Sequence, residues 1–498
     1  MTMKTAAFPL HVQGLSTDES ELVGELVAKL ERKKHYNDLR EKYFDGQDRV
    51  RQLGIAVPPG LRDLLAIVGW PGMAVSVLEE RLDWQGVALA DGDGGDDPFG
   101  LEQVITDNRL RVESSPAHLE ALIHGVDFIT ASRGDTKVGE PEILVTVESP
   151  TRMTGQWSPR LRRLTAAVSA DYDSEAGRYE AITLYLPDQT VYMERPNTVS
   201  DLRVVNRARH GLGRVPVVPL VNQPRRGRPW GRSEITPALI GYTDAGVRTM
   251  LSMEVSREFY SSPKEILLGA SSDAFVDEQG NRIPAWESYL GRFLALERDE
   301  DGELPSVEQL SAASPAPYIE QVKLLAQMVA GEASIPESYL GFVSANPSSA
   351  DAIRATEARL VKRAERRQTV FGAAWAEVMR LVLLVRDGSI PAEAQGLVSR
   401  WRDAATPTRA AMADATMKLV GAGVLPPDSD VTYEQLGFDQ TTIARLRADV
   451  RRARSERMLT RLVGAAEEAA ADEDVAALGQ VAVEEATGAR AGAASQNL

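Results

Sequence analysis

Histidine and cysteine, which serve most often in nucleophilic catalysis and transition-metal sites, are scarce or absent in this chain, and the abundant Asp and Glu residues show no spacing that suggests a catalytic site. The sequence contains no cysteine, which excludes disulfides, thiolate metal sites and a cysteine nucleophile. No histidine is followed by glutamate and no glycine by lysine, so the chain has neither a zinc-protease signature nor a Walker A loop. We therefore expect no enzymatic activity, no metal and no cofactor. The histidines are scattered along the chain: His11, His35, His118, His124 and His210.

Two short stretches could bind an ion. Asp91, Asp93 and Glu102 stand at positions 1, 3 and 12 of a calcium-type loop. Position 6, where such loops need glycine, holds Asp96, so we interpret this stretch as a solvated turn. Residues 225–232 place four arginines around a tryptophan. This segment could touch phosphate, although a charged linker leading into a helix is the simpler interpretation.

The composition is that of an acidic protein with several domains. Its 498 residues suggest two to four domains, and 43% of them are hydrophobic. No apolar run approaches the roughly 18 residues that span a bilayer, and the first ten residues lack a signal-peptide core, so we expect a cytoplasmic protein with no membrane partner. The net charge of −16 argues against tight DNA binding over the whole surface, because phosphate contacts dominate such binding. It does not argue against a surface past which DNA slides.

The strongest periodic pattern predicts one long helix over residues 349–386. Apolar residues recur at steps of three, four and seven, and the rod would be roughly 55 Å long. We expect Leu360, Phe371 and Trp375, which lie on this apolar stripe, to be candidate contacts between subunits. For Trp375 the alternatives are the core of the chain and a neighbouring subunit.

Before this long helix, the sequence predicts helices, then a sheet, and then an excursion, by which we mean a small β unit that the chain builds between two flanking helices. Helices are expected at 19–43, 61–67, 73–82, 98–109 and 116–130, with a strand at 84–89. Short β-branched segments between 142 and 222 predict an antiparallel sheet joined by hairpins. Two helices, 233–260 and 316–329, flank a small unit with strands at 265–268 and 293–296.

After the rod, the sequence predicts a small α-helical domain and a tail. Helices are expected at 392–402, 408–421 and 441–462. Residues 465–498 carry seven acids and one base among alanine and glycine, which predicts a disordered tail. The fold class is therefore α+β, mainly α.

This order of segments, with several short motifs, resembles the portal proteins of tailed bacteriophages, in particular the Gp6-like branch of actinobacteriophages. The likeness covers residues 19–386, and the region after residue 406 has no specific counterpart. The motifs are Tyr-Phe-Asp-Gly at 43–46, Leu-Tyr-Leu-Pro-Asp at 184–188, Gly-Arg-Val-Pro-Val-Val-Pro at 213–219 with Asn222, Gly-Arg-Ser-Glu-Ile at 231–235 and Ile-Pro-Glu-Ser-Tyr-Leu-Gly at 335–341.

The resemblance implies a ring, usually of about twelve copies, at one vertex of the capsid. Double-stranded DNA would pass through its channel during packaging and ejection. The implied partners are the terminase large subunit, the major capsid or scaffolding protein and a head–tail adaptor. The protein would be assembled in the host cytoplasm and would then reside in the virion.

The family's parts map onto this sequence in order. The implied regions are a wing of helices and sheet at 1–232, a first stem helix at 233–261, a small α/β clip at 262–316, a second stem helix at 317–332, a tunnel-loop region at 333–348, a long wing helix at 349–388, a helical crown at 389–464 and the acidic tail at 465–498. Family members turn the tunnel loop and one stem face toward DNA. The candidate DNA-channel residues are therefore Ser344, Asn346, Ser348, Ser349 and Lys323.

Two alternatives from other classes stay open at this point. The abundant Asp and Glu residues leave room for a metal-dependent nucleic-acid enzyme, which would degrade plasmid DNA with magnesium. A cellular helical scaffold protein would instead be a monomer or dimer in solution.

Overall fold

The computed structural model describes residues 12–47, 67–90, 97, 99–196, 201–260, 265–268, 306–309, 314–341, 350–405, 409–438 and 440–471. Contacts divide the chain into two compact units, Met1–Ala405 and Thr406–Leu498. The boundary falls after residue 405, inside the region predicted as crown (389–464). The predicted strand at 293–296 lies outside the described residues, and so does the predicted second helix at 61–67 except for its last residue.

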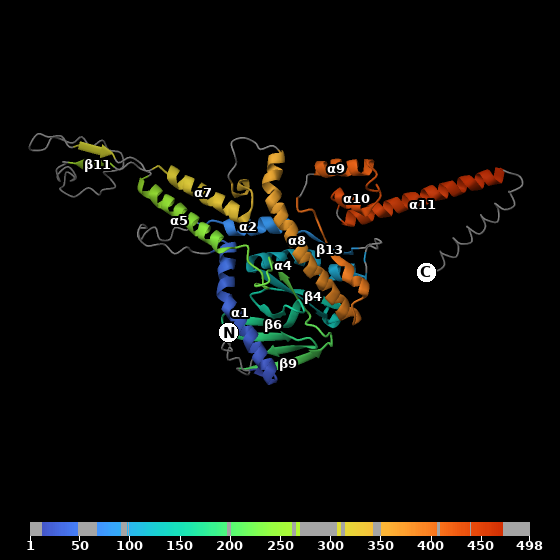
Figure 1. The fold of residues 1–498 in the computed structure, drawn as a ribbon, viewed down its shortest axis with the longest axis horizontal. Helices are drawn as coiled ribbons and strands as arrows, with labels where there is room; N and C mark the ends of the chain where they lie inside the picture. Colours follow the sequence, from blue (N-terminus) through green and yellow to red (C-terminus); the bar gives the residue numbers. More distant parts are fainter. Residues whose placement is uncertain are drawn as a thin grey trace, which may run out of the picture. The chain divides into compact units, whose positions relative to one another are not determined.

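In the first unit, α1 (Thr17–Phe44) covers one face of a six-stranded sheet (Figure 1). Ser16 starts the helix, because its hydroxyl accepts a hydrogen bond from the Glu19 amide while the Glu19 carboxylate accepts one from the Ser16 amide. Val23, Leu26 and the other apolar residues of the inner face are buried against the sheet, as the helical periodicity predicts.

The six-stranded sheet is a meander. Its order is β1-β9-β8-β7-β6-β5, with β1 parallel to β9 and the other pairs antiparallel. The predicted segments 165–172, 179–186, 190–194 and 202–205 correspond to four of these strands, whereas β1 and β5 were missed. Gly155 and Gln156 give β5 a weak strand signal. The strands are β1 (Val12–Gln13), β5 (Met153–Ser158), β6 (Arg163–Asp173), β7 (Arg178–Tyr185), β8 (Gln189–Glu194) and β9 (Leu202–Arg209).

The sequence predicts one sheet between residues 142 and 222, but the structure has a second, three-stranded sheet as well. It consists of β10 (Val217–Val221), β3 (Val126–Arg133) and β4 (Ile143–Glu148), in that order. The prediction of helix through residue 130 is therefore wrong. β3 is buried on both faces, with Phe128 in the core shared with the meander and Ile129 in the core around the long helix. Such a continuous apolar run cannot be told from a buried helix by periodicity alone.

The largest core surrounds α8 (Ala350–Asp387), which confirms the predicted rod. Helices α2 (Trp70–Glu79), α3 (Leu101–Asp107) and α4 (Leu110–His124) and strand β2 (Trp84–Leu89) contribute to this core. The predicted helix at 392–402 is wrong. Residues there form the 3-10 turn η5 (Ala392–Gly396) and β13 (Leu397–Trp401), which pairs antiparallel with β2.

Two helices flank the excursion. α5 (Pro237–Tyr260) begins four residues later than predicted, and α7 (Ala316–Ala333) packs beside it. Between them, β11 (Glu265–Leu268) pairs antiparallel with β12 (Ser306–Gln309). On α7, Leu325 and Val329 are buried, whereas Ile319 is 48% exposed. The 3-10 turn η4 (Glu337–Leu340) follows α7.

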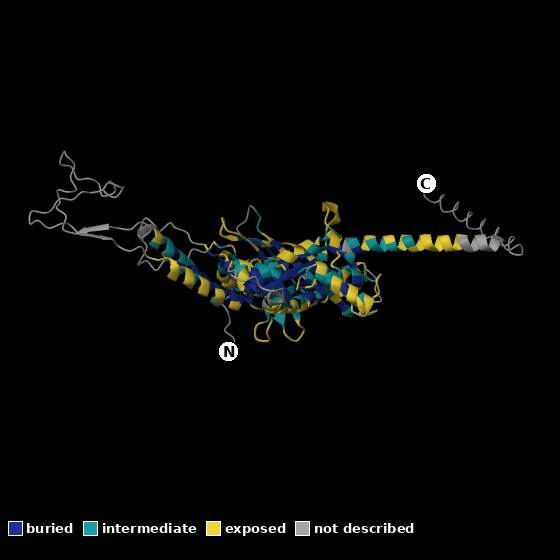
Figure 2. Ribbon diagram, turned by 90° about the horizontal axis from the view of Figure 1, so that it is seen from above, coloured by how far each residue is buried: buried dark blue, intermediate teal, exposed yellow. Residues whose placement is uncertain are grey.

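The second unit is helical. It contains α9 (Arg409–Gly421), α10 (Asp430–Gln435) and α11 (Gln440–Ala471). Figure 2 shows that most of the described length of α11 is exposed or half-buried. The helix extends to Ala471, past residue 465 where the sequence predicts the tail to begin. The rest of the predicted tail lies outside the described residues.

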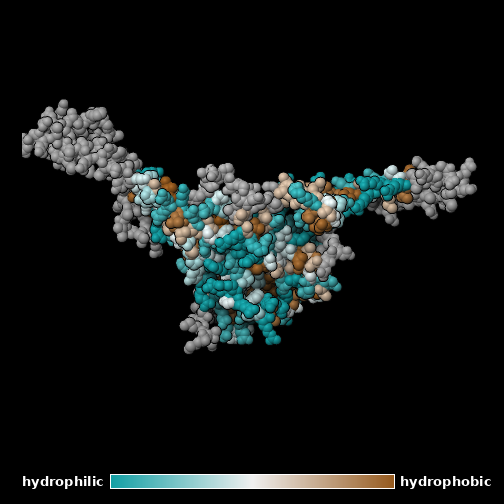
Figure 3. Space-filling view, turned by 45° about the horizontal axis from the view of Figure 1, so that its top comes forward, coloured by the Kyte–Doolittle hydropathy of each residue, from teal (hydrophilic) through white to brown (hydrophobic). Residues whose placement is uncertain are grey.

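One described segment, Glu357–Asp387 within α8, is long and apolar enough to cross a membrane by length and composition alone. This corrects the expectation that no segment approaches that length. Within the most apolar part of this segment 56% of the residues are buried, so the segment is also what the central helix of a large core should look like. Figure 3 shows a mainly hydrophilic surface over the body, with apolar side chains scattered on it.

Candidate functional site

Of the predicted DNA-channel residues, the structure describes only Lys323. It is exposed on α7. Ser344, Asn346, Ser348 and Ser349 lie outside the described residues, within the segment 342–349 that joins η4 to α8. The structure does describe both ends of this segment, and it shows what holds them.

A three-residue contact closes the base of the segment 342–349. The Tyr339 hydroxyl of η4 donates a 2.6 Å hydrogen bond to the Glu357 carboxylate of α8. Arg81, which follows α2, donates to the Tyr339 hydroxyl at 3.1 Å and lies 3.5 Å from the other Glu357 oxygen. Burial and the neighbouring Glu357 carboxylate raise the pKa of Tyr339, so the tyrosine stays a donor at neutral pH. The two ends of the segment are thereby held together.

A buried ion cluster joins the start of α5 to α8. Glu234 accepts 2.5 Å hydrogen bonds from both Arg363 and Arg367, which lie one turn apart on α8. The amide of Asn222 donates to the same carboxylate at 3.0 Å. Burial alone would raise the pKa of Glu234, but the two guanidinium charges outweigh burial and lower it. Glu234 is therefore ionised, and its charge is compensated inside the protein.

The segment of chain that precedes α5 also makes close contacts with its surroundings. Gly231 has a left-handed backbone with φ +67°, and a Cβ added there would lie 2.0 Å from the Asn222 carbonyl oxygen, so only glycine fits. The Ser233 hydroxyl donates to the Ile123 carbonyl. The Thr236 hydroxyl donates to Glu332 of α7 at 2.8 Å, which ties the two flanking helices together.

The predicted subunit-contact residues do not lie at the surface. Leu360, Phe371 and Trp375 are each 0% exposed, and all three belong to the core of their own chain. The Trp375 ring stacks on Trp84 with ring centroids 4.6 Å apart, and its Nε1 donates to His118 Nε2 at 2.9 Å. Of the alternatives for Trp375, the structure shows core packing. Contacts between subunits must therefore use other, exposed residues.

The candidate cation turn is described only in part. Asp91, Asp93 and Asp96 lie outside the described residues, and the Glu102 carboxylate is paired with Arg111 at 2.7 Å. Within the described ranges, no cluster of three or more His, Asp or Glu side chains could hold a metal ion. The contacts described above are structural: they hold α5, α7 and the base of the segment 342–349 to α8.

Sequence reasoning missed Arg81, Glu234 and Glu357. The available signal was the pair Arg363 and Arg367, because two arginines four residues apart share one face of a helix and need an acidic partner when that face is buried. Nothing in the sequence identifies Glu234 as that partner, since it lies more than a hundred residues away.

Comparison with known proteins decides what this arrangement belongs to. The sequence model of the family described as "Phage portal protein, SPP1 Gp6-like" matches residues 24–429. The chain belongs to the phage portal protein family. The portal protein of Mycobacterium phage D29 is 35% identical over 430 residues, covering 84% of this chain and 86% of the relative. That of Mycobacterium phage L5 is 36% identical over 391 residues, covering 77% and 79%.

Among solved structures, a chain of the "Virion of native gene transfer agent (GTA) particle" matches with a TM-score of 0.41 and 13% identity. The match covers 74% of this chain and 89% of that chain. As a phage portal protein, this chain is a structural component of the virion, and its family is structural rather than enzymatic. Its ring forms the channel through which double-stranded DNA passes at a capsid vertex.

Proposed function

We propose that about twelve copies of this portal protein form the ring, with the segment 342–349 facing the DNA in its bore. In the same proposal, Lys323 lies on the channel side of α7. The ring docks the terminase large subunit during packaging and a head–tail adaptor afterwards, and the capsid or scaffolding protein surrounds it. Assembly takes place in the host cytoplasm, and the protein has no enzymatic activity of its own.

The observation that carries this proposal is the closed base of the segment 342–349. The hydrogen bond between Tyr339 of η4 and Glu357 of α8 joins the elements on either side of the segment 342–349. A loop held in this way can project toward a moving duplex without being carried along by it. Ser344, Asn346, Ser348 and Ser349 are small and uncharged, so they can approach phosphates without the salt-dependent grip of lysine or arginine.

The test is to introduce positive charges that bind phosphate into this segment. Replacing Ser344, Asn346 and Ser349 with arginine should leave rings intact and slow DNA packaging in vitro, most strongly at low salt, because counterion release strengthens arginine–phosphate contacts there. The control variant carries arginine at Thr136, Ser174 and Asn206, three exposed positions on strands and turns of the first unit. Packaging at the parent rate by intact rings of the first variant would place the segment away from the DNA.

A further inference from the structure

Residues 225–228, which the portal function does not explain, form an exposed turn rich in arginine. Backbone hydrogen bonds run in both directions between Arg225 and Arg228, at 3.2 Å and 2.8 Å, so the turn has a defined shape. The side chains of Arg225, Arg226 and Arg228 are all exposed. Among the described residues, none of these three guanidinium groups has a carboxylate partner. The turn is therefore a local concentration of positive charge in a chain of net charge −16.

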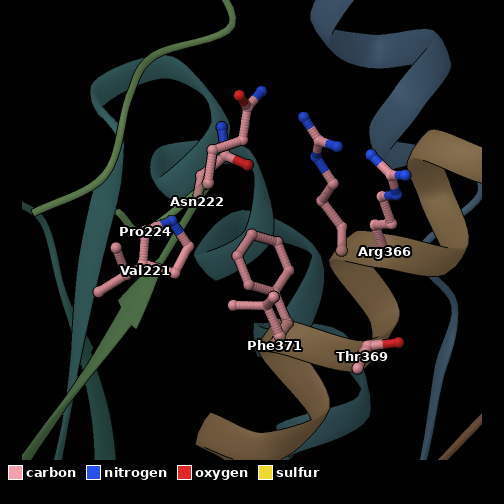
Figure 4. A pocket seen from close by; sticks show the side chains of 9 residues that line it. Val221, Asn222, Pro224, Arg366, Thr369 and Phe371 are labelled. Atoms are coloured by element: carbon pink, nitrogen blue, oxygen red, sulfur yellow. The ribbon is translucent and has the colours of Figure 1, made fainter. Parts of the chain in front are cut away.

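A cavity of about 370 Å³ opens beside this turn, between the end of β10 and α8. Figure 4 shows Val221 and Pro224 on one side, Arg366 and Thr369 on the other, and Phe371 between them. Pro224 directly precedes Arg225, so the cavity and the turn are continuous. Arg366 is exposed at the rim of the cavity.

The local charge balance stays positive after the buried ion pairs are counted. Glu234 is the acid that faces α8 here, and both of its oxygens are taken by Arg363 and Arg367. Glu365, on the same turn of α8, pairs with Lys362 at 2.6 Å. Arg366 and the turn arginines are therefore left to attract an anion from outside the chain.

We propose that the cavity and the arginine turn form a docking site for an acidic segment of a partner protein, with one apolar side chain inserted into the cavity. Guanidinium groups bind carboxylates with two parallel hydrogen bonds, which suits a run of Asp and Glu. The cavity has the volume of a small ligand pocket, and Val221, Pro224, Val370 and Phe371 give it an apolar part among polar lining residues, which suits one aliphatic or aromatic side chain. Duplex DNA fits less well, because a duplex has phosphates to offer the arginines but no side chain to fill the cavity.

The site can be tested on the full-length chain by fluorescence anisotropy. The probe is a labelled peptide of about twelve residues, made of Glu and Asp with one central Leu, and the control peptide carries Ser in place of Leu. At low salt, the double variant Arg226→Ala/Arg228→Ala should weaken binding of the Leu peptide roughly tenfold, since exposed ion pairs contribute up to about 1 kcal/mol each. The matched control is Arg203→Ala/Arg209→Ala, which removes two exposed arginines from β9 and should change binding by less than about twofold.

A third variant separates the cavity from the charge. Thr369→Trp fills the cavity from the exposed side of α8 and should remove the preference for the Leu peptide over the Ser peptide while leaving weak charge-driven binding. The proposal is overturned if the parent does not bind the Leu peptide, if it binds both peptides equally, or if both arginine pairs matter equally. A duplex of about 20 base pairs that binds more tightly than the peptide and depends on Arg226 and Arg228 would also overturn it, and would assign the surface to nucleic acid.

Discussion

Trp375 illustrates how far a single residue can be interpreted from periodicity. Its position on the apolar stripe of the long helix predicts burial, and it is fully buried. Its partners could not be predicted, because Trp84 and His118 come from a strand and a helix more than two hundred residues away. Of the two alternatives, a neighbouring subunit and the core of the chain, the apolar stripe is used to build the core of the chain itself.

Truncation of this side chain measures how much the core depends on it. Trp375→Ala should lower the free energy of unfolding of the first unit by about 3–5 kcal/mol, because it empties a large buried volume and leaves His118 without its donor. The control Leu161→Ala removes a side chain that is 52% exposed and should have little effect. Scanning calorimetry that showed the same melting temperature for Trp375→Ala and the parent would contradict the packing described here.

His118 should make the first unit sensitive to acid. Burial lowers the pKa of His118 to about 3, and Trp375 donates to its Nε2, so the proton of the neutral ring is on Nδ1. In the unfolded chain the His118 ring takes up a proton near pH 6.5, whereas in the folded chain it stays neutral until the pH approaches 3. The stabilising contribution is thus complete above pH 6.5 and is lost, at about 1.4 kcal/mol per pH unit, as the pH falls toward 3.

The variant His118→Gln tests this dependence, because glutamine can still accept the Trp375 hydrogen bond. Denaturant unfolding between pH 6.5 and 5 should show a shallower loss of stability for this variant than for the parent. The exposed His35→Gln serves as the control and should keep the slope of the parent. Parallel slopes for the parent and His118→Gln would show that this histidine is protonated in the folded state.

At the scale of elements, sequence patterns predicted the amphipathic pieces and failed on the pieces buried on both sides. α1 and α8 show one apolar stripe, so their periodicity is visible in the sequence. β3 and β13 show no such apolar periodicity in the sequence. β3 is covered on both faces, and β13 is an isolated strand whose partner, β2, lies about three hundred residues earlier. Pairing over such distances leaves no local signal.

The Glu234 cluster joins α5 to α8, and its removal should loosen that joint. Glu234→Gln leaves the buried Arg367 and the half-buried Arg363 facing a neutral amide, and breaking a buried ion pair costs about 3–5 kcal/mol. Hydrogen exchange should show faster exchange at the start of α5. The control Glu365→Ala breaks an exposed pair with Lys362 on the same helix, and such pairs contribute at most about 1 kcal/mol. Equal exchange rates in both variants would mean that the cluster does not hold the joint.

The pH dependence of this joint follows from the same charges. Because the folded pKa of Glu234 is lowered, its stabilising contribution is present above the ordinary glutamate pKa and is lost as the pH falls through the folded value. The faster exchange expected for Glu234→Gln at neutral pH should therefore converge with that of the parent in acid.

At the scale of the whole molecule, the acidic tail should not be needed for assembly. Residues 472–498 carry no apolar periodicity and follow the end of α11. A chain that ends at Ala471 should form rings of the same size and copy number as the parent, measured by mass photometry. Loss of rings in that truncated chain, with the helix content per residue unchanged by circular dichroism, would show that the tail is part of the assembly.

Cryo-electron microscopy of the purified full-length chain tests the central claim most directly. We expect a closed ring of about twelve copies, with the exposed face of α7 and the segment 342–349 lining the central hole. The hydrogen bond between Tyr339 and Glu357 should hold the base of that segment in every copy. Monomers or dimers at micromolar concentration, or rings in which the segment lies on the outer rim, would contradict this account.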